Sequence, residues 1–308
     1  MALVDEIRSA CGFVAARARW VRIASDERIG EYAQALPAPA AALGPDPEIA
    51  VLEGPAEVRA AFALTLDAIN FGSGYWPEIR RRPGRSGFTT MALGLRERFD
   101  AEGPWSAPQL EAIDSGEVGS ALGQDPGHRL MDLYAESLRD LGRRVAAEHG
   151  GRFVAVAQAA DGSAVALVER LAGWACFADA SSYEGRAIPF YKRAQLACAD
   201  LAHARVVRFG DLDRLTLFAD NLIPHVLRVD GVLAYDEELL ARIESGRLLD
   251  HGSPEEVEIR ACAVEAVERI ARARSELSPQ QLDHVLWNRG REAAYKARPR
   301  HRARSTAY

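Results

Sequence analysis

The residue that the sequence marks most clearly for chemistry is Asp220, an acid between a largely apolar stretch and the start of a helix. Pro224 follows where the first helical turn is expected, and Gly231 ends the run. This pattern predicts that Asp220 is the N-cap, where the partial positive charge of a helix start keeps a carboxylate ionised at neutral pH. Two interpretations follow: Asp220 only caps the helix, or it is a fixed carboxylate aimed into a cleft.

A second candidate is the glycine-containing aromatic loop that follows a predicted helix over residues 54–70. Its glycines permit close approach of the backbone to a ligand, and Phe71, Tyr75 and Trp76 supply flat walls for stacking. The alternative is an ordinary helix end whose aromatic side chains are buried in the core.

Two adjacent cations, Lys192 and Arg193, lie near the start of a predicted helix over residues 190–203. A helix start favours anions, so this pair is a candidate phosphate site. Because neighbouring residues on a helix point about 100° apart, we expect only one of them to reach a ligand. We assign Lys192 to that role; Arg193 is either a second ligand cation or a structural ion-pair partner.

The composition limits the possible functions. The chain has 308 residues, a net charge of −6 and a pI of about 5.7, whereas general nucleic-acid binders usually carry a basic surface. The scattered cysteines and sparse histidines lack metal-binding spacing, so we expect neither a metal nor a cofactor. The charged N-terminal residues argue against a signal peptide, and no apolar run approaches a membrane span. We expect a cytoplasmic monomer that binds neither membranes nor nucleic acid directly.

The elements that must position these residues are mostly helices. Helix starts are predicted after Ser25, Ser253 and Ser278, each a good N-cap. Residues 153–158 fit either a short strand or a helix. Other predicted helices cover residues 126–149, 212–218 and 236–245, and the last helix is expected to run to about residue 295. The fold class is therefore mainly α with a few short strands, in a single functional unit of residues 1–308 that can also divide into two closely packed lobes of about 1–150 and 151–308.

Several stretches, taken together, resemble the queuosine salvage proteins, which are queuosine 5′-phosphate N-glycosylases. These stretches are Ile69–Pro77, Phe190–Gln195, Leu217–Leu227, Glu256–Ala261 and His301–Tyr308. The resemblance implies a helical fold similar to helix-hairpin-helix DNA glycosylases and hydrolysis of queuosine 5′-monophosphate to release queuine for tRNA modification. It also implies that Asp220 is the catalytic aspartate and that Lys192 is the lysine of the family motif.

The chemistry of that reaction tells us what each residue would do. Breaking a ribose–base bond builds positive charge on the sugar, and a carboxylate such as Asp220 opposes it most effectively where water is excluded. The same carboxylate can also orient the attacking water or bond to the sugar carbon, and the sequence does not separate these roles.

A 7-deazapurine has carbon at position 7 and cannot be protonated there, so the protein must hold the departing base through its other edges. Acids, amides and hydroxyls suit a guanine-like edge, and aromatic rings suit its faces, each stacked ring contributing about 1–3 kcal/mol. The candidates for the edge are Asp67, Asn70, Ser73 and Asp179, and those for the faces are Phe71, Tyr75, Trp76 and Tyr183. For Asp67 and Asp179, a helix end and a turn residue are the alternatives.

The 5′-phosphate adds about two negative charges, for which Lys192 is the first candidate. Reserve cations are the loop at residues 80–85 and the tail residues Arg300, His301 and Arg302. His225 lies just over one helical turn beyond Asp220 and is a further substrate candidate, with simple burial as its alternative.

Two other functions remain open at this point. A DNA base glycosylase of the helix-hairpin-helix type predicts a basic groove and a glycine-rich hairpin before the catalytic helix; here the equivalent stretch, residues 208–213, lacks that hairpin. A non-catalytic nucleotide-binding module predicts that loss of the Asp220 charge leaves binding and biological activity intact.

Overall fold

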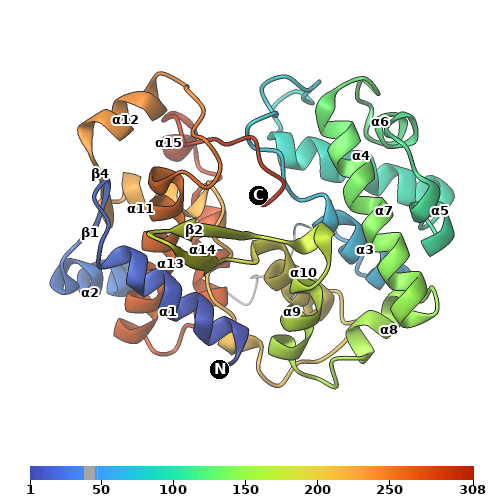
Figure 1. Cartoon of the computed structure of the whole chain (residues 1–308), viewed down its shortest axis with the longest axis horizontal. Helices are drawn as coiled ribbons and strands as arrows, with labels where there is room; N and C mark the ends of the chain where they lie inside the picture. The colour runs from blue at the N-terminus through green and yellow to red at the C-terminus, as the bar shows by residue number, and fades with distance from the viewer. Residues whose placement is uncertain (38–45, 47) are drawn as a thin grey trace. The chain divides into compact units, whose positions relative to one another are not determined.

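The computed structural model describes residues 1–37, 46 and 48–308, and it is mainly α-helical, as the sequence predicted (Figure 1). Four short strands, in two antiparallel pairs, complete the regular structure of this described part. No helix within these ranges is both long and apolar enough to span a bilayer.

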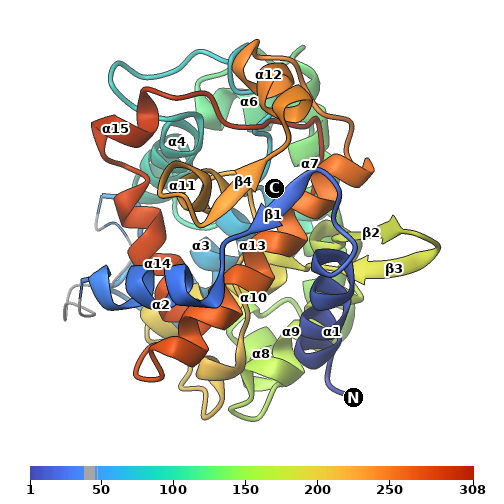
Figure 2. The same ribbon diagram turned by 90° about the vertical axis from the view of Figure 1, so that its left-hand side faces the viewer.

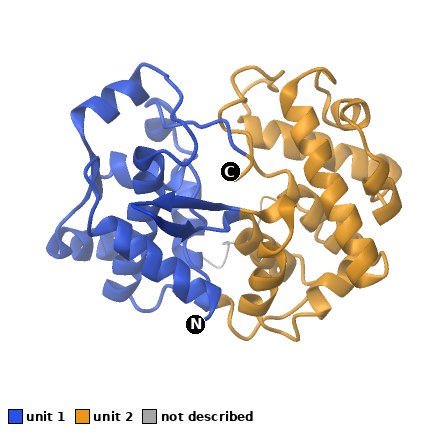
Figure 3. Cartoon of the chain, viewed as in Figure 1, with its two compact units in different colours: residues 1–43, 179–192, 213–305 blue, residues 44–178, 193–212, 306–308 orange. Residues whose placement is uncertain are grey.

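The chain forms two compact units (Figure 3). Unit 1 comprises Met1–Leu43, Asp179–Lys192 and Asp213–Ser305, and unit 2 comprises Gly44–Ala178, Arg193–Leu212 and Thr306–Tyr308. Each unit is therefore assembled from separated segments, so its boundaries do not follow the lobes expected at about 1–150 and 151–308. Whether the whole chain acts as one glycosylase stays a prediction.

Unit 1 is organised around the long helix α13, Pro254–Ala273. The helices α1, α2, α11 and α14 and the strand β1 pack against it, and its apolar residues form a continuous buried cluster with theirs. The other elements of this unit are α1 (Leu3–Ala15), β1 (Val21–Ile23), α2 (Asp26–Ala35), β2 (Ala180–Tyr183), β3 (Arg186–Pro189), α11 (Ile223–Val229), β4 (Leu233–Tyr235), α12 (Glu237–Glu244), α14 (Pro279–Arg289) and α15 (Ala293–Lys296).

Local sequence signals place several of these elements. The hydroxyl groups of Ser25, Ser253 and Ser278 accept the backbone N–H groups that begin α2, α13 and α14, so these predicted helix starts are confirmed. Figure 2 shows the pairing of β1 with β4 and the β2–β3 hairpin beside α1. The hairpin turns at Glu184 and Gly185, both with positive φ, which suits a tight two-residue turn.

Unit 2 is built on the long helix α7, Arg129–His149. At Gly142 an added Cβ would lie 2.7 Å from the backbone N of Glu111, so a glycine is needed for α5 to pack this closely. The other elements of this unit are α3 (Ala56–Ala68), α4 (Gly87–Glu102), α5 (Ala107–Ala112), α6 (Ser115–Leu122), α8 (Phe153–Gln158), α9 (Ala164–Ala172), the 3-10 turn η1 (Ala175–Phe177) and α10 (Lys192–His203), whose first residue is counted with unit 1.

The structure decides or corrects three predictions. Residues 153–158 form the helix α8. The helix predicted over residues 212–218 is wrong: only a 3-10 turn, η2 (Leu212–Arg214), forms there, followed by a buried non-helical segment over residues 215–219. The final helix ends at Arg289, before Gly290, and resumes as α15.

Candidate active site

Asp220 lies at the start of α11, although not at the predicted N-cap. The helix begins at Ile223 with Leu222 as N-cap, two residues after the acid, and Pro224 is in the first turn as predicted. Asp220 Oδ1 accepts the N–H groups of Leu222, at 2.7 Å, and Ile223, at 3.2 Å. Within the described residues these bonds reach Oδ1 alone, and Asp220 is half-buried. The second oxygen, Oδ2, is therefore available to a ligand.

The backbone before Asp220 is held by two buried side chains of unit 1. Asp283 Oδ1 accepts the Phe218 N–H at 3.1 Å, and Arg260 Nε donates to the Ala219 carbonyl oxygen at 3.0 Å. These long-range contacts give the segment hydrogen-bond partners without a helix, which accounts for its non-helical course. They also restrict where the Asp220 carboxylate can lie.

The backbone after Asp220 is fastened by the tail of unit 1. Asn221 Nδ2 donates to the His301 carbonyl oxygen at 3.1 Å. The neighbouring Arg300 is close enough to Asp220 for their charges to interact; burial lowers the pKa of Arg300, and the Asp220 carboxylate opposes that shift. Arg300, a reserve candidate in the sequence, is thus a cation of the Asp220 neighbourhood.

Asp179 is a buried carboxylate with one satisfied oxygen. Oδ2 accepts from Arg260 Nη2 at 2.7 Å and from the Lys192 N–H at 3.0 Å. Oδ1 is buried and has no hydrogen-bond partner in the part of the chain that the structure describes. Just ahead of Lys192, Tyr191 adopts φ of 48°, a strained conformation of the kind that clusters at functional sites. Asp179 thus closes the turn before α10 through Oδ2 and its carbonyl oxygen, and binding of a ligand N–H by Oδ1 stays a prediction.

In the sequence, Arg260 stands out only as part of the family-like stretch Glu256–Ala261, and its contacts with the Asp220 segment were missed. The available signal is its place in α13: it is fully buried, between Ile259 and Ala261, in a row of apolar positions. A charge at such a position is rare unless it is paired or functional.

Two other predicted residues are committed to the interior of unit 1. The Tyr183 hydroxyl donates to Glu258 at 2.7 Å, and burial raises its pKa. His225 Nε2 lies 2.9 Å from the Tyr295 carbonyl oxygen, and its Nδ1 lies 3.2 Å from Arg228 Nη2. Burial lowers the pKa of His225 to about 4, so the ring is neutral at pH 7, donating through Nε2 and accepting at Nδ1. These contacts support the burial alternative for His225 and a packing role for Tyr183.

In unit 2, Phe71 is part of the packing beneath the aromatic loop. Its ring meets that of Tyr134 edge to face at 4.9 Å, and the Arg193 guanidinium lies 4.9 Å from its centroid. The Tyr134 hydroxyl donates to the Phe71 carbonyl oxygen at 2.8 Å, and Arg193 Nη1 donates to the Ala68 carbonyl oxygen at 2.6 Å. Arg193 therefore supports the loop through a carbonyl hydrogen bond and a ring contact, and Phe71 packs in the interior; their ligand roles stay predictions.

Gly72 begins a tight turn in the aromatic loop that follows α3. Its φ is 118°, and an added Cβ would lie 2.9 Å from Leu130 Cδ1, so the position excludes a side chain. Its N–H donates to the carbonyl oxygen of Tyr308, the last residue of unit 2, at 3.1 Å. The turn continues with bonds from the Tyr75 and Trp76 N–H groups to the Gly72 carbonyl oxygen.

The remaining predicted residues of unit 2 differ in burial. Asp67 is fully buried in the last turn of α3, and Asn70 and Tyr75 are each 9% exposed. Ser73 Oγ is buried and makes no hydrogen bond within the described residues. Trp76 is half-buried against the start of α4. Ser73 therefore offers a hydroxyl without a partner in the described part of the chain, and ligand contacts by Asn70, Tyr75 and Trp76 stay predictions.

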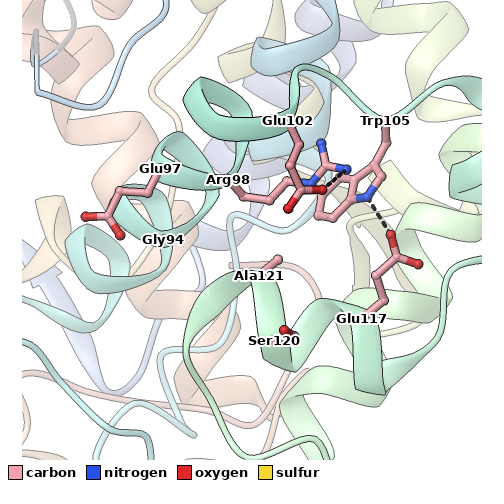
Figure 4. A pocket seen from close by; sticks show the side chains of 8 residues that line it. All are labelled: Gly94, Glu97, Arg98, Glu102, Trp105, Glu117, Ser120 and Ala121. Atoms are coloured by element: carbon pink, nitrogen blue, oxygen red, sulfur yellow. Dashed lines mark hydrogen bonds and ion pairs between the residues drawn. The ribbon is translucent and has the colours of Figure 1, made fainter.

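A surface pocket of about 350 Å³ in unit 2 does not suit the expected substrate (Figure 4). Arg98 lies 4.2 Å above the Trp105 ring and pairs with Glu102, and Trp105 Nε1 donates to Glu117 at 2.7 Å. The lining contains none of the predicted site residues. Its glutamates would repel a 5′-phosphate.

The comparisons with known proteins give one consistent result. The family model for the queuosine salvage protein matches residues 52–308. A protein of Sphaerobacter thermophilus named queuosine 5′-phosphate N-glycosylase/hydrolase is 34% identical over 267 residues, covering 82% of each chain. Proteins with the same name from Dictyostelium discoideum and Bos taurus are 29% and 28% identical and cover 82% and 78% of this chain, and 79% and 78% of their own. The chain belongs to the queuosine salvage protein family.

Proposed function

We propose that this protein hydrolyses the N-glycosidic bond of queuosine 5′-monophosphate and releases queuine for salvage into tRNA modification. The family match over residues 52–308 carries this proposal. The fixed, half-buried carboxylate of Asp220 gives it a chemical basis. The products are queuine and ribose 5-phosphate.

Asp220 is the proposed catalytic residue. When the bond between the base nitrogen and ribose C1′ breaks, its electron pair leaves with the base, and positive charge builds on the sugar. Oδ2 of Asp220 opposes that charge while the backbone N–H groups hold Oδ1 in place. The oxygen of water then bonds to C1′, and of the two protons of that water one goes to the departing base and the other stays on the new hydroxyl.

Asp179 is the proposed recognition group for the base. A guanine-like edge presents a ring N–H and an amino group, and both are donors. The unused Oδ1 of Asp179 is an acceptor of the matching kind, already desolvated in the folded protein. The candidate substrate contacts of unit 2 are Asn70, Ser73, Tyr75, Trp76 and Asp67, each to be tested separately.

Lys192 is the proposed 5′-phosphate ligand in unit 1. It is the first residue of α10, and its backbone position is set by the bond to Asp179 Oδ2. A lysine acts as a point charge toward phosphate and needs no paired geometry. Arg300, whose charge interacts with that of Asp220, is the second cation that we propose for the nucleotide.

We further propose that the protein works as a monomer in the cytoplasm. Its cysteines Cys11, Cys176, Cys198 and Cys262 are free and buried. Reduced cysteines are typical of that compartment.

The direct test is to incubate the protein with queuosine 5′-monophosphate and measure queuine and ribose 5-phosphate. Release in equal amounts is expected. Tight binding without release would favour a non-catalytic nucleotide-binding module, and base release from damaged duplex DNA in its place would favour a DNA glycosylase.

A further inference from the structure

We propose that Arg260 is a positioning residue for the glycosidic reaction, and this inference rests on the function proposed above. Its guanidinium holds the Asp179 carboxylate with Oδ1 turned to the ligand, and it also fixes the backbone that leads into Asp220. One buried side chain thus orients both the base-recognition acid and the catalytic acid.

Arg260 contacts residues of unit 1 outside its own helix. Nη2 donates to Asp179 Oδ2 at 2.7 Å, and Nε donates to the Ala219 carbonyl oxygen at 3.0 Å. The guanidinium lies 3.9 Å from the ring centroid of Phe190, which supports it on one face. Because the guanidinium is planar and rigid, bonds from Nη2 and Nε fix the two partners relative to each other.

The Asp179 carboxylate gains a defined orientation from this arrangement. Arg260 and the Lys192 N–H both donate to Oδ2, so rotation that would turn Oδ2 outward breaks two hydrogen bonds. Oδ1 is left buried and unpartnered in the described structure. An unpaired buried carboxylate oxygen is unfavourable unless a ligand supplies the missing donor.

Stability alone is a poor explanation for this charge. The side chains of both Arg260 and Asp179 are fully buried, and burying an ion pair costs desolvation energy that its attraction often fails to recover. A well-packed apolar pair would stabilise α13 at least as well. Arg260 instead also bonds the carbonyl oxygen of Ala219, the residue before Asp220. This contact gives the buried pair a role in placing the catalytic acid.

The test is Arg260→Lys, with Arg274→Lys as the matched control. Lysine keeps the charge but cannot bond both partners with a planar fork. Arg274 is also a buried arginine of unit 1, at the end of α13, whose Nη1 donates to the Ala33 carbonyl oxygen at 3.0 Å. It contacts neither Asp179 nor the Asp220 segment, so its replacement reports the general cost of losing a buried guanidinium.

We expect Arg260→Lys to raise KM for queuosine 5′-monophosphate by about ten- to hundredfold, the effect of a misplaced charge-assisted hydrogen bond. We expect kcat to fall by about a hundredfold as Asp220 shifts. Arg274→Lys should lower the melting temperature but leave KM unchanged. A merely structural role would reduce the amount of folded enzyme, which lowers Vmax and cannot raise KM; an unchanged KM in Arg260→Lys therefore overturns the proposal.

A second variant keeps the proposal testable if Arg260→Lys does not fold. Asp179→Asn is nearly isosteric, and its amide oxygen can still accept from Arg260 and Lys192, which places an N–H group where Oδ1 now lies. We expect KM to rise by a similar factor; an unchanged KM in this folded variant overturns the proposal. If the wild-type protein releases no queuine, the proposed function fails. If it does and KM stays unchanged in the variants, the hydrolysis stands, and what fails is the inference about Arg260 together with the base-recognition role of Asp179.

Discussion

The change from Asp220 to Asn separates the observed role of this residue at a helix start from its proposed role as the catalytic charge. An asparagine oxygen can accept the N–H groups of Leu222 and Ile223 as Asp220 Oδ1 does now. Asn and Asp begin helices about equally well, so we expect the free energy of unfolding to change by about 1 kcal/mol or less. The variant loses the negative charge, and an amide N–H donor takes the place of the Oδ2 acceptor.

The expected loss of activity follows from that charge. Two unit charges about 4 Å apart attract by about 4 kcal/mol at an effective dielectric constant of about 20, which suits a half-buried carboxylate near a protein surface. A barrier change of about 1.4 kcal/mol is tenfold in rate, so a full charge would give nearly 10³-fold. The sugar carries only part of a charge in the transition state, and we expect kcat to fall by about 10²- to 10³-fold.

The assay is queuine release by chromatography, with thermal unfolding to show that each variant is folded. Asp236→Asn is the matched control, because Asp236 begins α12 by accepting the Glu238 N–H at 2.9 Å and has no proposed catalytic role. We expect the control to keep wild-type turnover. Turnover within about threefold of wild type in folded Asp220→Asn would refute the catalytic assignment and leave this residue as a helix-start acceptor.

Two further predictions concern binding and pH. Lys192→Ala should raise KM for queuosine 5′-monophosphate by about ten- to hundredfold but leave KM for the free nucleoside almost unchanged. Lys296 is exposed, and Lys296→Ala should alter neither KM. An equal effect of Lys192→Ala on both substrates would remove Lys192 from the phosphate site. Burial lowers the pKa of His225 to about 4 and that of His301 to about 3, below the ordinary value of about 6.5. As pH falls below about 6.5, the unfolded chain therefore binds protons that the folded protein does not. The free energy of unfolding should decrease by a few kcal/mol between about pH 6.5 and 4, and these two groups should leave it unchanged above pH 7. Urea unfolding at stepped pH checks this, and His225→Asn should flatten the slope; an equal slope in the variant would contradict the assignment.

The fold was predictable where short-range patterns decide it. Helix starts at Ser253 and Ser278 depend on a hydroxyl and the N–H groups of the next turn, all within a few residues. The helix predicted over residues 212–218 was wrong because the partners of that segment are far away in sequence: Asp283 and Arg260 supply the hydrogen bonds that a helix would otherwise have supplied. Local propensity contains no information about such partners.

The candidate site was predictable in its residue types and less so in its geometry. Asp220 was found from its place before a helix, although the helix begins two residues later than a simple cap predicts. Lys192 was singled out from its place near a helix start, and the resemblance added that it is the lysine of the family motif. Tyr183 and His225 have side-chain types that suit a ligand, and only the three-dimensional structure shows that Glu258 and the Tyr295 carbonyl oxygen already engage them. Long-range hydrogen bonds therefore distinguish residues that stabilise the fold from residues whose side chains can still bind a ligand.

The central claim, hydrolysis of queuosine 5′-monophosphate, is tested most directly by competition in one reaction. Equal concentrations of queuosine 5′-monophosphate and guanosine 5′-monophosphate are incubated with the wild-type protein, and both free bases are measured by chromatography over time. We predict that queuine accumulates and that guanine does not. Release of guanine at a comparable rate would contradict the proposed specificity, and release of neither base would contradict the proposed reaction.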